Sequence, residues 1–162
     1  MVAQSTDRAQ LIEASSPEQI EQVRELFLEY AASLNFSLCF QSFDDEVKNL
    51  PGSYAPPSGC LYLLLHDGRA AGCVALRKLE ENICEMKRLY VRPEARGHGY
   101  GGLLAERIIA AAREIGYGQM RLDTIGPSMK DAVELYRRLG FKEIPPYRKN
   151  PIEGVLYMGL AL

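Results

Sequence analysis

A glycine-rich junction between a strand-like and a helix-like segment constrains the fold of this chain more than any other feature. Residues 83–91 are typical of a strand, and from residue 104 apolar side chains recur at helical spacing. Four of the six residues that follow Arg96 are glycine: Gly97, Gly99, Gly101 and Gly102. Backbone amides at a helix N-terminus attract phosphates, and glycine lets the backbone approach them closely. Because Arg96 adds positive charge, the junction predicts a strand–loop–helix unit that binds a phosphate-bearing ligand.

Three consecutive strand-like runs lead into this junction. They cover residues 60–65, 70–79 and 83–91. The Asp67-Gly68 pair between the first two runs is a strong signal for a two-residue hairpin. Residues 80–82 turn the chain into the third run. Strands that are joined by such short turns pair antiparallel, so the three runs predict an antiparallel meander.

Helix and strand signals surround the meander. The segment Ser16-Pro17-Glu18-Gln19 predicts a helix start with a capping box, and apolar residues follow it at steps of three and four. The remaining expected helices cover residues 44–50, 104–115 and 131–139, and the remaining strands cover residues 120–123, 141–144 and 155–162. The predicted fold class is therefore α/β of the α+β type, with a mixed, mostly antiparallel central sheet flanked by helices.

Length and composition fit one ordinary globular domain over residues 1–162, with residues 1–10 as a flexible or weakly ordered N-terminus. A net charge of -2 gives no footprint for nucleic acid, and no apolar run is long enough to span a membrane. Four widely spaced cysteines and two histidines give little support to a zinc site, so no metal is expected. The polar N-terminal residues lack the apolar core of a signal peptide, which makes a cytoplasmic location the expectation.

Two other phosphate-binding loops compete for the glycine-rich segment. A nucleoside triphosphatase loop requires Gly-Lys-Ser/Thr, which does not follow here. The dinucleotide fingerprint G-x-G-x-x-G is satisfied by Gly97, Gly99 and Gly102, and Asp123 ends the next expected strand, near the place of a ribose-binding acid. Against the fingerprint, residues 92–96 separate the first glycine from its strand. Hairpins also replace the alternating strands and helices of a parallel sheet.

Three correctly ordered segments resemble the Gcn5-related N-acetyltransferase (GNAT) family. The family's coenzyme A loop follows the pattern Gln/Arg-x-x-Gly-x-Gly/Ala, which residues 96–101 fit at every fixed position. Leu-Tyr-Val-x-Pro at 89–93 matches the family's usual strand end, and Leu-Tyr-Arg-Arg-Leu-Gly-Phe at 135–141 resembles its second signature. The resemblance implies a GNAT-like fold, in which the strand before the cofactor loop splays from its neighbour, and acetyl-CoA as co-substrate.

The resemblance also implies which residues bind this co-substrate. Backbone groups at the splayed strand end would bind the pantetheine arm, and the loop amides would bind the pyrophosphate. The implied cofactor-binding residues are Leu89, Tyr90, Val91, Arg96, Gly97, His98, Gly99, Tyr100, Gly101 and Gly102. A backbone amide near Leu89 would polarise the thioester carbonyl, and His98 would contribute only its backbone. Met129 stands where the family often has an asparagine, so the family's asparagine contact is not expected here.

Two side chains are implied as catalytic groups. Tyr136 matches the family's tyrosine that protonates the departing thiolate, and a core tyrosine is the alternative interpretation. Glu85 lies four residues before Leu89, where some members carry a glutamate base that removes the ammonium proton. An ion pair with Lys87 or with a cross-strand cation is the alternative for Glu85. Strand alternation would place Glu85, Lys87, Leu89 and Val91 on one face of the sheet.

The acceptor is not specified by these motifs. A small-molecule amine is the expectation, with Phe36, Phe40 and Tyr147 as candidate substrate-binding residues on long connections. Arg77 or Arg88 could recognise a carboxylate, although a salt bridge explains each equally well. A protein N-terminus or a lysine side chain is an alternative acceptor, and a non-catalytic acyl-CoA binding or sensing domain is the alternative from another class. The resemblance suggests a monomer or homodimer.

Overall fold

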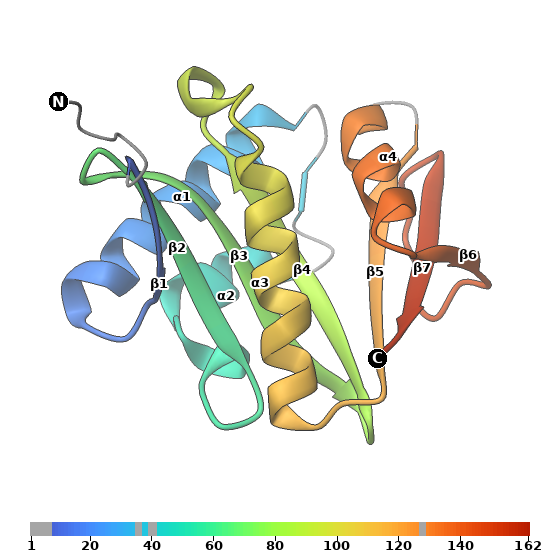
Figure 1. Ribbon diagram of the computed structural model, residues 1–162. Coiled ribbons are helices and arrows are strands. Elements are labelled where there is room, and N and C mark those ends of the chain that lie inside the picture. The colour runs from blue at the N-terminus through green and yellow to red at the C-terminus, as the bar shows by residue number, and fades with distance from the viewer. Residues whose placement is uncertain (1–7, 35–36, 39–41, 127–128) are drawn as a thin grey trace, which may run out of the picture.

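The computed structural model describes residues 8–34, 37–38, 42–126 and 129–162, which form one twisted sheet with helices on both faces (Figure 1). The seven strands follow the order β1-β2-β3-β4-β5-β7-β6. Their bounds are β1 (Ala9–Glu13), β2 (Cys60–His66), β3 (Arg69–Glu80), β4 (Ile83–Val91), β5 (Gln119–Ile125), β6 (Lys142–Ile144) and β7 (Val155–Ala161). Neighbouring strands pair antiparallel except β4 and β5, which run parallel. The predicted fold class is confirmed, and this topology excludes the parallel sheet of a dinucleotide-binding fold.

The helices divide between the two faces of the sheet (Figure 1). One face is covered by α1 (Pro17–Ser33), α2 (Phe43–Lys48) and the short turn η3 (Gly52–Tyr54). The other face is covered by α3 (Tyr100–Ile115) and α4 (Lys130–Arg138), with the turn η4 (Pro93–Ala95) leading into α3. Each face has its own apolar core: Leu26 and Phe27 of α1 belong to one, and Leu104 and Ile108 of α3 belong to the other. The sheet therefore separates two cores, and a site that joins them has to lie at a gap in the sheet.

Strand β1 lies where the sequence predicts a weakly ordered N-terminus. Ala9 and Gln10 pair with His66 and Leu65 of β2, so the predicted flexible segment is wrong for at least these two residues. The segment Ala9–Glu13 has only a weak strand pattern of its own. It forms a strand because β2 offers it an edge to pair with, and β-propensity depends strongly on such context.

Strand β4 contains a bulge that the sequence did not reveal. The register of the β3–β4 pair shifts at this point, so that Arg88 and Leu89 together lie opposite Val74. Arg88 has a left-handed backbone with a φ of 60°. One extra residue in a strand reverses the alternation of side chains beyond it and bends the strand. The bulge therefore changes which side chains of β4 reach each face.

Because of the bulge, the side chains of β4 point to other faces of the sheet than predicted. Met86 packs in the core beneath α3, so its neighbours Glu85 and Lys87 point toward the face of α1 and α2. Beyond the bulge, Leu89 and Val91 pack against the core beneath α3. The prediction that Glu85, Lys87, Leu89 and Val91 share one face is wrong, because simple alternation takes no account of an inserted residue.

Strands β4 and β5 diverge after a short parallel contact. Their pairing covers only Ile83–Glu85 of β4 and residues 119–121 of β5. β5 itself pairs with β7 from Gln119 to Ile125. Residues 86–91 of β4 therefore turn one row of backbone groups toward an opening in the sheet. The splayed strand that was predicted before the cofactor loop is confirmed.

Replacing Ser16 with alanine tests the start of α1. The Ser16 Oγ accepts a hydrogen bond from the Gln19 amide at 3.2 Å, and the Gln19 Oε1 accepts one from the Ser16 amide at 3.1 Å, so the predicted capping box is confirmed. Ser16→Ala should lower the free energy of unfolding by about 1 kcal/mol, measured by urea denaturation. Ser15→Ala is the matched control, because Ser15 is exposed and donates to Gln19 through its backbone. Equal losses in both variants would contradict the cap.

Candidate active site

A cavity of about 640 Å³ lies where β4 and β5 diverge. Residues 86–91 of β4 and 122–125 of β5 form its sides. Tyr30 at the end of α1 lines it from one face of the sheet, and Tyr136 of α4 lines it from the other. The cavity therefore connects the two faces at the gap in the strand pairing.

The glycine loop borders this cavity at the N-terminus of α3. Gly99 caps the helix with a left-handed backbone, φ 78°, and a Cβ atom at Gly99 would meet no atom within 4 Å. Arg96 lines the cavity, and its Nε donates a hydrogen bond to the Val91 carbonyl at 2.9 Å. The first amides of a helix have no carbonyl partner within the helix. The loop thus combines these amides, room beside them and a positive charge, which together suit a phosphate group.

The aromatic side chains of the loop contact one another. The Tyr100 hydroxyl is hydrogen-bonded to Nδ1 of His66 in β2. His98 stacks on both rings, with centroid separations of 5.3 Å. His98 is exposed, whereas Tyr100 is buried beside the core of α3. This stack fixes the loop to the β2–β3 hairpin.

The open backbone edge of β4 suits an extended ligand. Leu89 and Val91 direct their side chains into the core beneath α3, so their backbone groups are what they present to the gap. The Tyr90 ring packs edge-on against Tyr30, with a centroid separation of 6.0 Å. An extended chain with amide groups can pair with such an edge as an added strand. The pantetheine arm of coenzyme A has this chemistry.

Tyr136 places a phenol in the cavity. Its ring packs edge-on against Phe141, with a centroid separation of 5.7 Å, and the residue is only 7% exposed. Burial raises the pKa of Tyr136 well above its usual value of ten, so the phenol stays protonated at neutral pH. Because Tyr136 also lines the cavity, it combines core packing with access to a ligand, and the two interpretations of this residue are compatible.

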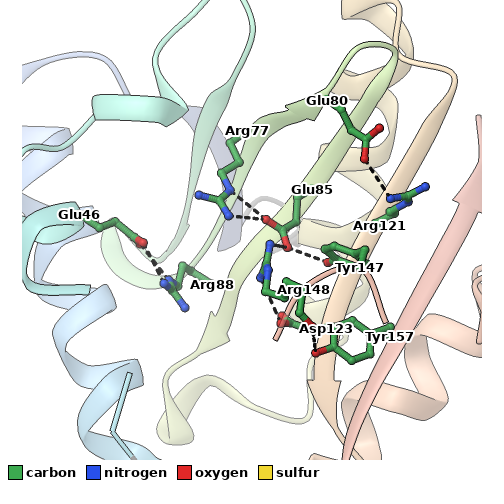
Figure 2. A network of polar contacts seen from close by, with 10 residues as sticks. All are labelled: Glu46, Arg77, Glu80, Glu85, Arg88, Arg121, Asp123, Tyr147, Arg148 and Tyr157. Carbon is green, nitrogen blue, oxygen red and sulfur yellow. Dashed lines mark hydrogen bonds and ion pairs between the residues drawn. The ribbon is translucent and has the colours of Figure 1, made fainter. Parts of the chain in front are cut away.

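Glu85 lies at the centre of a buried ion-pair network (Figure 2). Its Oε1 accepts a charge-assisted hydrogen bond from Nε of Arg77 at 2.9 Å and lies 2.8 Å from Nη2 of the same side chain. Its Oε2 accepts hydrogen bonds from the Tyr147 hydroxyl at 2.7 Å and from Arg148. Arg148 also contacts Asp123 at 3.1 Å, and the Glu85 side chain is fully buried. The network therefore ties the connection between β6 and β7 to the two strands that flank the gap.

The charge state of Glu85 follows from these partners. Burial alone would raise the pKa of Glu85, but the positive charges of Lys87, Arg148 and Arg77 and the hydrogen bond from Tyr147 outweigh it and lower the pKa. Glu85 is also not among the residues that line the cavity in the described part of the chain. A low pKa and three partners give this carboxylate little capacity to accept a proton.

A second ion pair lies on the same face of the sheet and links β4 to α2. Arg88, at the bulge, donates two hydrogen bonds to Glu46 of α2, at 2.8 and 2.9 Å. The guanidinium also lies over the Phe43 ring, 5.1 Å from its centroid. This pairing is the salt-bridge alternative that the sequence left open for Arg88, and Arg77 likewise pairs with Glu85.

The candidate acceptor residues fall in different places. Phe36 and Phe40 lie outside the described residues. Tyr147 donates to Glu85 and is half-buried in the connection between β6 and β7.

Sequence reasoning missed Arg148 and the position of Lys87, which is 5% exposed and lines the cavity. Arg148 lies in an irregular proline-rich segment without a periodic pattern, so no local signal marks it.

The described part of the chain has neither a metal-binding cluster nor a membrane-spanning helix. Among residues 8–34, 37–38, 42–126 and 129–162, there is no cluster of three or more His, Cys, Asp or Glu side chains that could hold a metal ion. No helix within the same ranges is long and apolar enough to cross a membrane.

Comparison with known proteins identifies the family. The sequence matches the acetyltransferase (GNAT) family over residues 20–141. It is 41% identical over 148 residues to an uncharacterized N-acetyltransferase of Schizosaccharomyces pombe, covering 90% of each chain. It is also 28% identical over 102 residues to the N-acetylaspartate synthetase of Xenopus tropicalis, covering 62% of this chain and 37% of that one. The chain belongs to the GNAT family and is therefore an acetyltransferase by family.

Solved structures agree with this assignment at the level of the fold. An acetyltransferase from Streptococcus agalactiae superposes with a TM-score of 0.77 at 21% identity, covering 96% of this chain and 99% of that one. A protein from Salmonella typhimurium, solved with its cofactor acetyl-CoA, superposes with a TM-score of 0.69 at 16% identity, covering 96% and 94%. The splayed sheet described above is thus the fold of known acetyltransferases.

Replacing Glu85 with glutamine tests the network. Breaking a buried ion pair leaves uncompensated charge, so Glu85→Gln should lower the free energy of unfolding at neutral pH by about 3–5 kcal/mol. The folded-state pKa of Glu85 lies below its unfolded value. The carboxylate therefore stabilises the fold above the unfolded pKa, and this contribution is lost as pH falls through the folded pKa. Urea denaturation should show the two proteins converging in acid.

Glu80→Gln is the control for this experiment. The Glu80 side chain is 60% exposed and lies 3.4 Å from Arg121, so its loss should cost less than about 1 kcal/mol. A Glu85→Gln variant that is no less stable than Glu80→Gln, or whose deficit is the same at every pH, would contradict the network.

Proposed function

We propose that this protein is an N-acetyltransferase that moves the acetyl group of acetyl-CoA to a primary amine of a small molecule by direct attack. The observation that carries the proposal is that Arg96 of the glycine loop, the open edge of β4 and Tyr136 line one cavity. An acyl-CoA enzyme needs these three parts: an anion site for the pyrophosphate, a strand edge for the pantetheine arm and an acid for the leaving thiolate.

The co-substrate contacts follow from the geometry of the loop and the strand. Backbone groups of Leu89, Tyr90 and Val91 would pair with the pantetheine arm along the open edge. The pyrophosphate would lie against backbone amides at the start of α3. The residues that we assign to the pyrophosphate site are Arg96, Gly97, His98, Gly99, Tyr100, Gly101 and Gly102. The structural neighbour that was solved with acetyl-CoA supports this class of ligand.

Direct attack divides the chemistry among few groups. The neutral amine nitrogen bonds to the thioester carbonyl carbon, and the carbon–sulfur bond breaks to release a thiolate. Tyr136 gives its phenolic proton to that sulfur, and the proton that the nitrogen loses as the amide forms returns to Tyr136 through water in the cavity. A backbone amide near Leu89, beside the bulge, stabilises negative charge on the carbonyl oxygen. No acyl-enzyme is required, because the amine and the thioester meet within the same cavity.

The ammonium proton of the acceptor needs a different route. The family resemblance predicts Glu85 as the base, but this carboxylate is fully buried and paired with Arg77 and Arg148. The geometry gives better support to Glu85 as a positioning residue that holds the connection carrying Tyr147 and Arg148. We therefore propose that the proton leaves through water in the cavity.

A small acceptor fits the shape of the site. The cavity has walls from both faces of the sheet and a volume of about 640 Å³, and the pantetheine arm would share it, so little room is left for a bulky acceptor. The name of one relative, N-acetylaspartate synthetase, describes the acetylation of a small molecule. Both observations favour a free metabolite over a folded protein as the acceptor.

Replacing Tyr136 with phenylalanine tests the enzyme against a non-catalytic acyl-CoA sensor. The variant keeps the ring that packs on Phe141 but lacks the acid, so turnover should fall roughly a hundredfold to ten-thousandfold while the Kd for acetyl-CoA stays nearly unchanged. Thiol release on a panel of amines measures turnover, and calorimetry measures the Kd.

Tyr117→Phe is the matched control for the loss of a phenol. Tyr117 lies after the end of α3, where its hydroxyl donates to the Ser58 carbonyl at 2.6 Å, and it does not line the cavity. Its turnover should equal that of the unsubstituted protein. If Tyr136→Phe matched this control in turnover, Tyr136 would not be the acid.

Replacing Gly99 with glutamate tests the anion site. The added carboxylate occupies the space beside the loop amides and repels a phosphate, so the affinity for acetyl-CoA should fall by more than about a hundredfold. Gly116→Glu is the control, because Gly116 ends the same helix with a left-handed backbone and open space around it. Both variants carry similar backbone strain. Calorimetry that shows equal acetyl-CoA affinity in the two variants would mean that the loop is not the pyrophosphate site.

A further inference from the structure

Lys87 occupies an unusual position for a lysine. It lies in the middle of β4, is 5% exposed and lines the cavity. Buried charges are costly unless other charges or hydrogen bonds compensate them. Burial lowers the pKa of Lys87 to about 8, so most of the side chain is still protonated at neutral pH. The cost of burying this cation in the cavity wall has to be offset by some interaction.

Two carboxylates, Glu85 and Asp123, act on Lys87, and each of them is also paired with an arginine. The network in Figure 2 contains four arginines and four carboxylates, and each arginine lies against a carboxylate. Lys87 has interactions of its own with the protein, but it adds one positive charge to a balanced set. Within the described residues, this face of the cavity therefore carries an excess positive charge.

The cavity as a whole shows the same excess. Four cationic residues line it, and two acidic ones do. The cations are Lys87, Arg88, Arg96 and Lys130, and the acids are Asp123 and Asp131. Lys130 belongs to the side of α3 and α4. Lys87 lies on the opposite face, and the guanidinium of Arg96 lies over the Tyr90 ring on that same face, 5.9 Å from its centroid.

With the proposed coenzyme A site, an acceptor would approach from the face of Lys87. The pyrophosphate site and Tyr136 lie on the side of α3 and α4, and the pantetheine arm would fill the gap along β4. A second substrate then reaches the thioester from the side of α1 and α2, toward which Lys87 points.

We propose that the acceptor is an amine that also bears a carboxylate, such as a free amino acid, and that Lys87 binds this carboxylate. This inference rests on the proposed function and names the substrate class of the same site. A carboxylate against Lys87 would neutralise the excess charge and keep the amine near the thioester. Lysine suits this task because its ammonium group is a compact charge with three donors that adapts to different acceptors.

Matched ligand pairs test the proposal on the full chain saturated with coenzyme A. The probes are L-leucine against isopentylamine and L-phenylalanine against phenethylamine, which differ only in the carboxylate. Calorimetry should show that the amino acid of each pair binds roughly tenfold to a hundredfold more tightly. Lys87→Met should abolish this preference, and Lys87→Arg should keep part of it. Lys78→Met is the control, because the Lys78 side chain on β3 is 50% exposed and pairs with Glu81 at 3.7 Å.

Each outcome separates the inference from the function on which it rests. Coenzyme A binding without any preference for the amino acids would overturn the carboxylate site and leave the acetyltransferase proposal standing. Absence of coenzyme A binding would overturn both. If Lys87→Met lowered kcat equally for both members of a pair and left KM unchanged, Lys87 would be a base instead. Should Lys87→Met fail to fold by circular dichroism, the unsubstituted protein and Lys87→Arg still decide the matter.

Discussion

The divergence of β4 from β5 is the constraint on which the rest of the structure depends. Strand pairing between them ends at Glu85, and the bulge at Arg88 bends β4 away beyond that point. Backbone groups along a strand need hydrogen-bond partners, so an edge that opens inside a sheet is costly unless water or a ligand occupies it. The same opening joins the two faces, which lets a cofactor on one side meet an acceptor on the other.

Buried charges hold this opening in place. Arg148 reaches from the connection between β6 and β7 to Glu85 on β4 and Asp123 on β5, and it thereby links the two diverging strands. Arg88, the bulge residue itself, is fixed to Glu46 of α2. Buried ion pairs add little net stability compared with apolar packing. Their contribution here is geometric, because they fix β4, β5 and α2 in position relative to one another.

Local signals predicted most of the elements but not the connections among them. The capping box at Ser16, the Asp67-Gly68 hairpin and the glycine loop depend on a few adjacent residues, and their chemistry is visible in the sequence. The bulge at Arg88 has no such signal, so alternation placed Leu89 on the wrong face. Glu85 shows the same limit: Tyr147 and Arg148 lie about sixty residues away in the sequence and meet it only in the folded chain. Strand β1 was not predicted because its own sequence pattern is weak and it becomes a strand by pairing with the edge of β2.

Hydrogen–deuterium exchange with and without acetyl-CoA is the most direct test that the gap in the sheet is the co-substrate site. The account predicts slower exchange over residues 86–102, which include the open edge of β4 and the glycine loop, and unchanged exchange in the pairing of β1 with β2. NAD at the same concentration should leave all of these amides unchanged. Protection that is absent with acetyl-CoA, that lies elsewhere in the chain or that NAD reproduces would contradict the central claim.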